Sequence, residues 1–493
     1  MATSDASSNI AQAHAPILEG LLAYSERHLQ PFHIGHKEGR FFPAELKRIL
    51  GQKTLAIDLP STDEIGTTSD AAGCVAEAQA LAAQLYGAAH TRYLTQGSTS
   101  GVITMMMTAT QAGDAILLAR NSHRAIFSGL ALSGARPIYL LPDSNPNCGA
   151  LPIQAEAIRA AFRRHPEIKA VLLTRPTYYG VAQDLAEIAQ ICREQQCPLL
   201  IDEAHGAHFA FLPQETIQPA LAFPVDLVTQ SVHKTLCSLN GSSQIHLGYQ
   251  SLLAIERLQQ MLNLLQSTSP SYLLLASLDA ARRMLWEQGP ALFAQAVLQA
   301  ERLRQQINEL PGLTTLDSAC YPELSMYQFD PLRLVVNLKQ IGMTGYKARE
   351  ILKGQFQIEC ELEDFYNVVF VLGPFTDEAM SQNLLNALRF IAHQAKRVES
   401  DQTETIPYRA WPVPTLVLEP REAVLGKKAL IKLENAQNRI CSEVITPFPP
   451  AIPIICPGEV ISAEIIELLQ ELRANNVFVQ ATDPRLHHVS VIE

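Results

Sequence analysis

Two short apolar segments, each followed by reactive side chains, constrain the possible fold and function of this chain most. The first, Leu199–Ile201, is followed directly by Asp202, and the second, Leu227–Val228, leads into Ser231-Val232-His233-Lys234. Apolar runs of this length are typical of buried strands in a parallel sheet. Because ligands collect where such strands end, we expect Asp202 and Lys234 to face one site.

The surrounding sequence alternates short apolar runs with longer amphipathic segments. Six runs predict strands: Ala115–Arg120, Pro137–Leu141, Ala170–Thr174, Pro198–Ile201, Leu227–Gln230 and Gln244–Leu247. Between them, apolar residues recur every three or four positions over Ile153–Arg164 and Leu185–Glu194, as they do in helices. Strands that alternate with helices predict an α/β fold with a mainly parallel central sheet covered by helices.

A smaller α/β region follows this alternation. It contains predicted strands at Leu332–Leu338 and Val368–Leu372 and predicted helices near Gly345–Gly354 and Asp377–Ala392. The charged, proline-bearing stretch Arg397–Pro414 indicates a linker, and a further helix is predicted at Ala463–Ala474. We expect four parts: an N-terminal arm (1–50), a large domain (51–330), a small α/β domain (331–396) and a C-terminal domain (397–493).

An acid at the end of one strand and a lysine at the end of another suit pyridoxal 5'-phosphate (PLP). The lysine amine condenses with the PLP aldehyde, and the acid keeps the pyridine nitrogen protonated, so that the ring can accept electrons. Each motif alone has another interpretation. A lysine after a strand is usually a solvated surface residue, and Asp202-Glu203-Ala204-His205 could be a helicase-type acidic box. The sequence has no G-x-x-x-x-G-K-[ST] phosphate loop, which argues against a helicase.

A candidate phosphate site precedes these motifs. Thr95-Gln96-Gly97-Ser98-Thr99-Ser100-Gly101 opens the run Val102–Thr110. Glycine and hydroxyl groups at a helix N-terminus offer N–H and O–H donors and the favourable end of the helix dipole to an anion. An ordinary helix cap is the alternative interpretation. Beside a PLP lysine we expect a phosphate site, with Ser231 as an added contact.

Three histidines lie near these motifs. His123 follows a predicted strand, and His205 and His233 neighbour Asp202 and Lys234. Imidazole can stack on a cofactor ring or move protons. Capping or packing roles remain the alternatives for all three.

Composition excludes several other classes of protein. Hydrophobic residues make up 47% of the chain and charged residues 18%, as in globular proteins. The formal net charge of −11 argues against nucleic acid as the main partner. No apolar run is long enough to span a membrane, and no secretory signal is visible. Nine scattered cysteines suit a reducing cytoplasm and give no reason to expect a metal site.

Together these motifs resemble the bacterial-type ornithine/lysine/arginine decarboxylases, PLP enzymes of the aspartate-aminotransferase fold group (fold-type I). The resembling segments are Phe32–Gly39, Glu77–Gln79, Gly97–Thr99, Arg120–His123, Leu132–Ala135, Pro176–Gly180, Asp202–His208, Ser231–Leu236, Thr268–Tyr272, Pro447–Pro453 and Pro457–Glu459. The chain departs from the usual family pattern at Asn240–Gly241 and Ala451, among other positions. None of these departures removes a catalytic group.

The resemblance implies a role for each matching residue. Lys234 would bind the PLP aldehyde, Asp202 the ring nitrogen, and His123 one face of the ring. The remaining cofactor contacts would be Ser98, Thr99, His205, Ser231 and His233, with Thr268 and Ser269 reaching the site of a second subunit. Glu459 is the first candidate for the distal cation of the substrate, with Glu361 and Asp364 behind it.

The implied activity is PLP-dependent decarboxylation of lysine, arginine or ornithine by a homodimer or larger homo-oligomer. Lysine is marginally favoured, because an ammonium group needs only one well-placed acid, whereas guanidinium prefers a bidentate partner set. Two alternative functions stay open from the sequence: another PLP-dependent transferase or lyase of the same fold, and a non-catalytic regulatory homologue.

Overall fold

The structure is a computed structural model that describes residues 11–27, 29–145, 147–395, 412–448, 453–474 and 477–493. The described chain divides into two compact units. The first comprises residues 1–109, 192–213 and 218–292, and the second comprises residues 110–191, 214–217 and 293–493. Most of the predicted linker Arg397–Pro414, and Ala451, lie outside the described residues.

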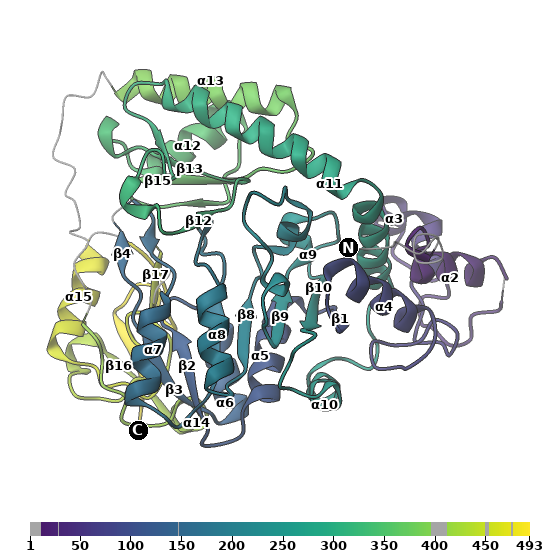
Figure 1. The fold of residues 1–493 in the computed structure, drawn as a ribbon, viewed down its shortest axis with the longest axis horizontal. Coiled ribbons are helices and arrows are strands. Elements are labelled where there is room, and N and C mark those ends of the chain that lie inside the picture. The colour runs from purple at the N-terminus through teal and green to yellow at the C-terminus, as the bar shows by residue number, and fades with distance from the viewer. Residues whose placement is uncertain (1–10, 28, 146, 396–411, 449–452, 475–476) are drawn as a thin grey trace. The chain divides into compact units, whose positions relative to one another are not determined.

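The first unit contains one half of the strand and helix alternation. Its main elements are α2 (Pro16–Ser25), α3 (Ala44–Ile57), α4 (Cys74–Tyr86), β1 (His90–Leu94), α5 (Gly97–Ala109), β8 (Leu199–Asp202), β9 (Leu227–Gln230), α9 (Val232–Thr235), β10 (Ser243–Leu247) and α10 (Ile255–Leu265) (Figure 1). The strand order is β1-β10-β9-β8. β8 and β9 are parallel, whereas β10 runs antiparallel to both of its neighbours.

The helix α5 packs closely against this group of strands. It contacts β1, β9 and β10. Gly101 makes the approach possible, because a Cβ atom there would overlap the hydroxyl of Thr229 in β9 and lie 3.0 Å from the Thr229 Cβ. The helix that begins at the predicted phosphate site therefore rests directly on the strand that leads to Lys234.

The second unit contains three further parallel strands, the small α/β region and the C-terminal region. Its main elements are β2 (Ala115–Ala119), α6 (Ala125–Ser133), β3 (Arg136–Leu140), α7 (Ala155–Arg164), β6 (Ile168–Thr174), β13 (Arg333–Asn337), α12 (Gly345–Phe356), β15 (Asn367–Val371), α13 (Glu378–Ala395), α14 (Pro420–Leu425), β16 (Lys428–Lys432), α15 (Ala463–Ala474) and β19 (His488–Ile492). β2 pairs in parallel with both β3 and β6. Helices α8 (Ala186–Glu194) and α11 (Tyr272–Asn308) belong in part to each unit.

The small α/β region and the C-terminal region each have their own packing. β13 and β15 pair antiparallel within a four-stranded sheet, and α12 packs on α13. In the C-terminal region, α15 contributes Ile465, Leu468 and Leu469 to a buried apolar cluster that includes Val489 and Val491 of β19. The strands and helices that periodicity predicted are confirmed, with ends that differ by at most three residues. The predicted domain limits stay predictions.

Two further observations concern membrane-spanning helices and the cysteines. Among the described residues, no helix combines the length and the hydrophobicity that a membrane crossing requires. The nine cysteines all lie among the described residues, and no disulfide joins them.

The close approach at Gly101 generates a stability prediction. Gly101→Ala adds a methyl group where Thr229 already lies, and overpacking of this kind costs about 1–3 kcal/mol. We expect a lower midpoint of thermal unfolding, measured by circular dichroism. Gly354→Ala is the matched control, because a Cβ atom there, inside α12, would meet no atom within 4 Å. The control should be neutral or stabilising by up to about 1 kcal/mol, since alanine is the better helix former. Equal stability of wild type and Gly101→Ala would contradict the packing argument.

Candidate active site

The parallel pairing of β8 and β9 brings the two key motifs to one edge. Asp202 is the last residue of β8 and lies opposite Thr229 of β9. β9 ends at Gln230, Ser231 follows, and Lys234 lies in the short helix α9 (Figure 1). Because parallel strands end at the same edge, Asp202 and the segment that bears Lys234 lie at neighbouring strand ends, as predicted from the sequence.

The amine of Lys234 contacts an imidazole at this edge. The distance from Lys234 Nζ to His205 Nε2 is 3.0 Å. His205 is buried and Lys234 is partly exposed. Asp202 is also buried, and its Oδ1 accepts a hydrogen bond from the Ala204 N–H at 3.2 Å. A buried carboxylate, a buried imidazole and a partly exposed lysine are thus placed on adjoining segments of the first unit.

Hydroxyl groups mark the predicted phosphate site. The Ser231 hydroxyl donates to Ser98 Oγ at 2.7 Å, and Ser98 is the second residue of the 13-residue helix α5. The Gly97 N–H donates to the Gly241 carbonyl at 2.8 Å, which ties the start of α5 to the loop after Lys234. Gly97 has a φ of +72°, and a Cβ atom there would meet nothing within 4 Å.

These residues fit PLP. Open space lies beside hydroxyl donors at a helix N-terminus, where a phosphate is favourable. The Lys234 amine suits the aldehyde, and the Asp202 carboxylate suits the protonated ring nitrogen.

Other predicted cofactor residues lie at the surface of the first unit or have local partners. His233 Nδ1 lies 2.7 Å from the Ser242 carbonyl. Thr99, Thr268 and Ser269 are exposed in the single chain. Their predicted contacts with the cofactor stay predictions.

His123 belongs to the second unit. It lies in the turn between β2 and α6, and its Nδ1 accepts a hydrogen bond from the Ala125 N–H at 3.2 Å. The imidazole is partly exposed. Its predicted stacking on the ring also stays a prediction.

The three candidate substrate carboxylates have different surroundings, all within the second unit. Glu361 is exposed, whereas Asp364 and Glu459 are buried. Asp364 accepts hydrogen bonds from the Tyr179 hydroxyl at 2.5 Å and from Asn367 Nδ2 at 2.9 Å. Burial raises the pKa of Asp364, and these hydrogen bonds oppose the rise.

Glu459 forms a bidentate ion pair with Arg120. The two distances are 2.5 Å from Arg120 Nη1 to Oε1 and 2.8 Å from Nη2 to Oε2. Arg120 belongs to the family-like segment Arg120–His123, but no role was predicted for it from the sequence. The available signal was its position directly after the apolar strand Ala115–Ala119, because a charge buried there needs a partner.

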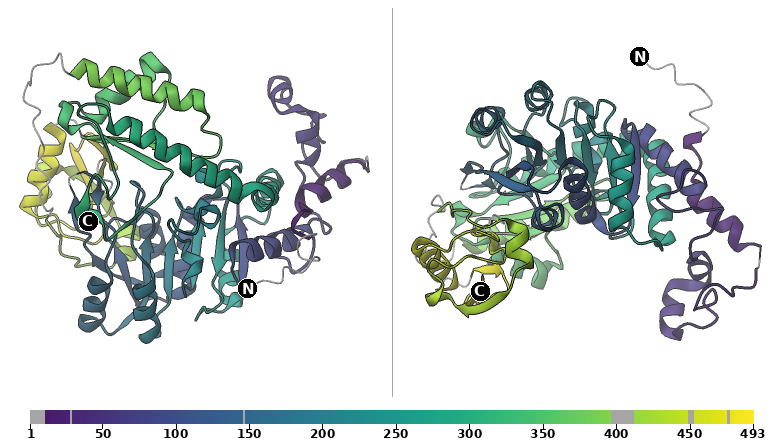
Figure 2. Two further views of the ribbon diagram at one scale, coloured as in Figure 1. Left: turned by 45° about the horizontal axis from the view of Figure 1, so that its top comes forward. Right: turned by 90° about the horizontal axis from the view of Figure 1, so that it is seen from below.

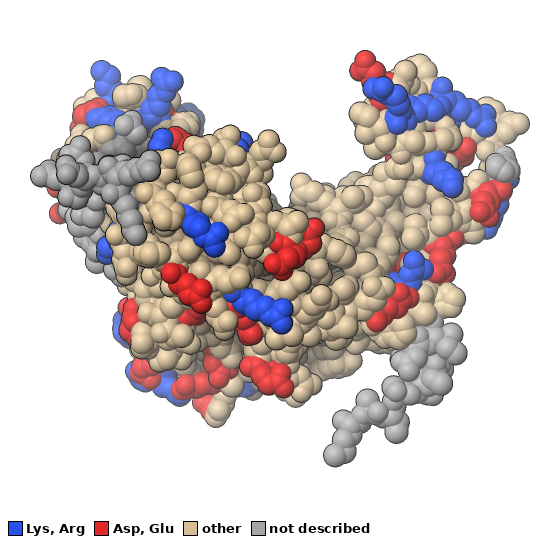
Figure 3. All heavy atoms as spheres, turned by 90° about the horizontal axis from the view of Figure 1, so that it is seen from above, with Lys and Arg blue, Asp and Glu red and all other residues tan. Residues whose placement is uncertain are grey.

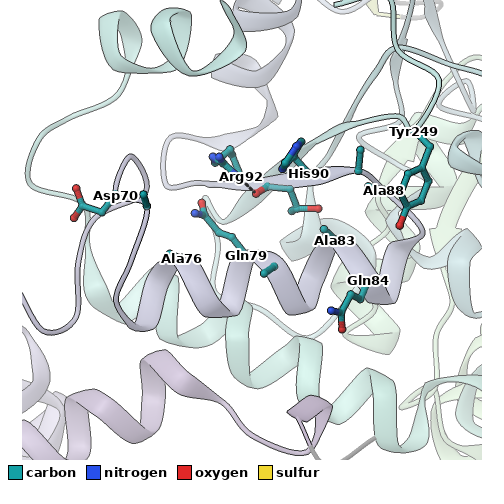
Figure 4. A pocket seen from close by; sticks show the side chains of 13 residues that line it. Asp70, Ala76, Gln79, Ala83, Gln84, Ala88, His90, Arg92 and Tyr249 are labelled. Atoms are coloured by element: carbon teal, nitrogen blue, oxygen red, sulfur yellow. Dashed lines mark hydrogen bonds between the residues drawn. The ribbon is translucent and has the colours of Figure 1, made fainter. Parts of the chain in front are cut away.

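A separate pocket of about 360 Å³ lies against the edge strand β1 (Figure 4). It is lined by side chains of α4 and β1, among them Gln79, His90 and Arg92. Arg92 is held by neutral partners, with Nε 2.7 Å from Gln259 Oε1 and Nη1 3.0 Å from the Thr91 carbonyl. No predicted site residue lines this pocket, so it is distinct from the candidate active site.

Several curated proteins are similar to this chain over nearly its whole length. The arginine decarboxylase of Bacillus subtilis is 34% identical over 98% of this chain and 99% of its own. The arginine decarboxylase of Bacillus anthracis is 34% identical over 94% of each chain. A lysine decarboxylase of Pseudomonas aeruginosa is 23% identical over 88% of this chain and 71% of its own.

Solved structures show the fold. The lysine decarboxylase of Francisella novicida matches with a TM-score of 0.82 and 20% identity, over 99% of this chain and 82% of its own. The constitutive lysine decarboxylase of Escherichia coli matches with a TM-score of 0.82 and 18% identity, over 98% and 82%. These matches confirm the predicted fold class, an α/β fold with a mainly parallel sheet.

The family match identifies the chain. The family described as Orn/Lys/Arg decarboxylase matches through its major domain over residues 15–380 and through its C-terminal domain over residues 404–481. The match covers most of the chain, and the sequence motifs had predicted the same family. This protein therefore belongs to the Orn/Lys/Arg decarboxylase family and is a decarboxylase.

Proposed function

We propose that the chain catalyses PLP-dependent decarboxylation of L-arginine to agmatine and carbon dioxide. The choice among the three basic amino acids rests on the relatives. Four arginine decarboxylases are 33–34% identical to this chain, whereas two lysine decarboxylases are 22–23% identical. This evidence outweighs the marginal preference for lysine that the sequence alone suggested.

One observation supports the PLP chemistry above the others. Within one compact unit, the Lys234 amine lies 3.0 Å from His205, next to the strand that ends in Asp202, while Ser231 binds Ser98 at the start of α5. An amine, a carboxylate and hydroxyl groups at a helix N-terminus therefore occur together. Each feature alone is common, but the combination is the set that PLP requires.

Lys234 and Asp202 would have different roles in the reaction. Bound PLP supplies a protonated ring that accepts the electron pair left at Cα when carbon dioxide departs. Lys234 would hold the aldehyde until the substrate amine replaces it. The Lys234 amine can then hold a proton, 3.0 Å from His205, and deliver it to Cα. Asp202 would keep the ring nitrogen protonated by direct charge pairing.

We further infer that the active form is at least a homodimer. Thr268 and Ser269, which resemble family residues that reach the partner's cofactor, are exposed in the single chain. The N-terminal segment of the first unit, with α2 and α3, projects from that unit (Figure 2). It exposes large apolar side chains, with Phe32 at 85%, Phe41 at 81% and Ile49 at 74%.

Charge favours a second copy as the partner of this segment. Between residues 37 and 53 it has five basic and two acidic residues, whereas the whole chain has a net charge of −11. Figure 3 shows Lys and Arg side chains gathered on the projecting segment. A basic, apolar segment would be complementary in charge to another copy of this chain, whose net charge is negative.

A direct product assay tests the proposed function. We expect the wild type to convert arginine to agmatine with a higher kcat/KM than it shows for lysine or ornithine. Lys234→Ala should abolish turnover, because the amine that holds the cofactor and delivers the proton is gone. Lys347→Ala, at an exposed site in α12, is the control and should retain full activity.

The same preparation locates the cofactor link. Borohydride should bleach the visible absorption of the wild type, and mass spectrometry should find the reduced adduct on the peptide that contains Lys234. An adduct on any other lysine would refute the assignment. Release of a keto acid in place of carbon dioxide would refute the decarboxylase reaction.

Asp202→Asn tests the ring-nitrogen partner. The amide keeps the shape of the side chain but not its charge, so the ring loses the acid that keeps it protonated. We expect kcat to fall by about 100-fold or more, a change of roughly 2.7 kcal/mol in barrier height, while PLP still binds. Steady-state kinetics and the borohydride-trapped fraction measure the two effects separately. A near-normal rate would place the acid elsewhere.

Light scattering tests the assembly. The active wild type should have at least twice the mass of one chain, and Phe32→Ser with Phe41→Ser should shift it toward a monomer with reduced activity, because the apolar contact is lost. Phe375→Ser changes a side chain that is 69% exposed in the second unit and is the control. A fully active monomeric wild type would overturn the inference.

A further inference from the structure

We propose that Glu459 and Arg120 are positioning residues through which the C-terminal domain holds the turn that bears His123. This inference rests on the proposed function and on the role that the family resemblance implies for His123, which is contact with one face of the PLP ring. It differs from the role predicted for Glu459 in sequence reasoning, which was direct recognition of the substrate cation.

The side chain of Arg120 is held by one segment of the C-terminal domain. Besides its bidentate pair with Glu459, Nη2 donates to the Ile454 carbonyl at 3.3 Å and Nε lies 3.4 Å from the Pro453 carbonyl. Arg120 and Glu459 have side chains that are 4% and 1% exposed. The pair is therefore shielded from water and fixed in direction by its two-point geometry.

The carboxylate of Glu459 is the anion that faces Arg120. Cys456 and Tyr139 also lie at this cluster, with the Tyr139 ring centroid 5.0 Å from Arg120 Cζ. Burial raises the pKa of both groups well above their ordinary values, so both stay neutral. Loss of the Glu459 charge would leave a buried guanidinium without its counter-ion, which is strongly unfavourable.

Arg120 transmits this constraint to His123. It follows β2 directly, and its N–H donates to the Leu140 carbonyl at 2.8 Å, beside the end of β3. Only Asn121 and Ser122 separate it from His123, and the Ser122 N–H donates back to the Ala119 carbonyl at 3.1 Å. A short, hydrogen-bonded turn with a fixed first residue leaves little freedom for His123.

The C-terminal domain also holds the far end of this segment. α14 packs against α6, the helix that follows the turn. Arg421, in α14, lies with Nη1 3.4 Å from the Leu132 carbonyl near the end of α6. The domain thus contacts the segment before His123 through Glu459 and the segment after it through α14.

Direct contact of Glu459 with substrate would disturb this arrangement. Its Oε2 accepts from Arg120 and also from the Cys456 N–H at 2.7 Å, while Oε1 accepts from Arg120. A substrate cation would have to compete with a guanidinium that is already paired at two points.

A double-mutant cycle separates the two roles. The variants are Arg120→Met, Glu459→Met and the double variant, which removes both charges and so leaves no unpaired ion in the core. The readouts are kcat and KM for arginine, and the visible circular dichroism of bound PLP, which reports the orientation of the ring. Glu187→Gln, in an exposed pair with Arg159 2.9 Å away, is the matched control and should change none of them.

The positioning role predicts a specific pattern. Glu459→Met should lower kcat by about tenfold or more with KM changed less than about threefold, because misplacement of a group at the site mainly affects the transition state. The circular dichroism of PLP should change, and the double variant should lose no more than the worse single variant. A KM raised by about tenfold at constant kcat, with losses that multiply in the double variant, would instead show direct substrate contact and overturn the proposal.

Two further measurements separate failure of this inference from misfolding of a variant and from absence of PLP. If a single methionine variant fails to fold, Arg120→Lys retains a charge but not the two-point geometry, and the same kinetic and spectroscopic pattern is expected in milder form. Unchanged kinetics and dichroism in Arg120→Lys would then count against positioning. Borohydride trapping on Lys234 of the wild type does not depend on this cycle. A wild type that carries no PLP refutes the proposed function. An active wild type with bound PLP, whose variants have unchanged kinetics and dichroism, refutes only this inference.

Discussion

The parallel pairing of β8 with β9 is the constraint on which the candidate site depends. Both strands are buried along their whole length, with Asp202 as the last residue of β8 and Ser231 directly after the end of β9. The parallel direction places those ends together, so Asp202 and the segment with Ser231 and Lys234 lie at the same edge. The antiparallel strands β10 and β1 serve a different purpose, because β1 leads into α5 and brings Ser98 to the same edge.

The sequence predicted what depends on local pattern and missed what depends on distant contacts. Runs such as Ala170–Thr174 are strands because their apolar residues are contiguous, and the structure confirms them. Lys234 and Asp202 were recognisable because each motif lies within a few residues of a strand end. The contact between Lys234 and His205 joins residues 29 apart, and the pair of Arg120 with Glu459 joins residues 339 apart. No periodicity reports such pairs, and only the general cost of an unpaired buried charge hints that a partner exists.

Buried charge connects the parts of the second unit more specifically than apolar packing does. Apolar surfaces tolerate small shifts, since dispersion contacts have no preferred direction. The carboxylates of Asp364 and Glu459 tolerate such shifts less well, because each accepts directional hydrogen bonds. Asp364 accepts them from Tyr179 and Asn367, and Glu459 from Arg120. A pair of this kind adds little net stability compared with apolar residues of the same size, but it selects one arrangement. We regard the C-terminal domain as a source of geometric specificity for this reason.

The glycine at position 101 has a consequence for the size of ligand that the site can hold. Because residue 101 is a glycine, α5 packs closely against Thr229 of β9, so the start of α5 with Ser98 and the strand that leads to Lys234 are held near each other. This packing sets the spacing between the main chain at Ser98 and the strand that leads to Lys234, while the Lys234 side chain can still adjust the position of its amine. A cofactor that binds both Ser98 and Lys234 would have to match this main-chain spacing.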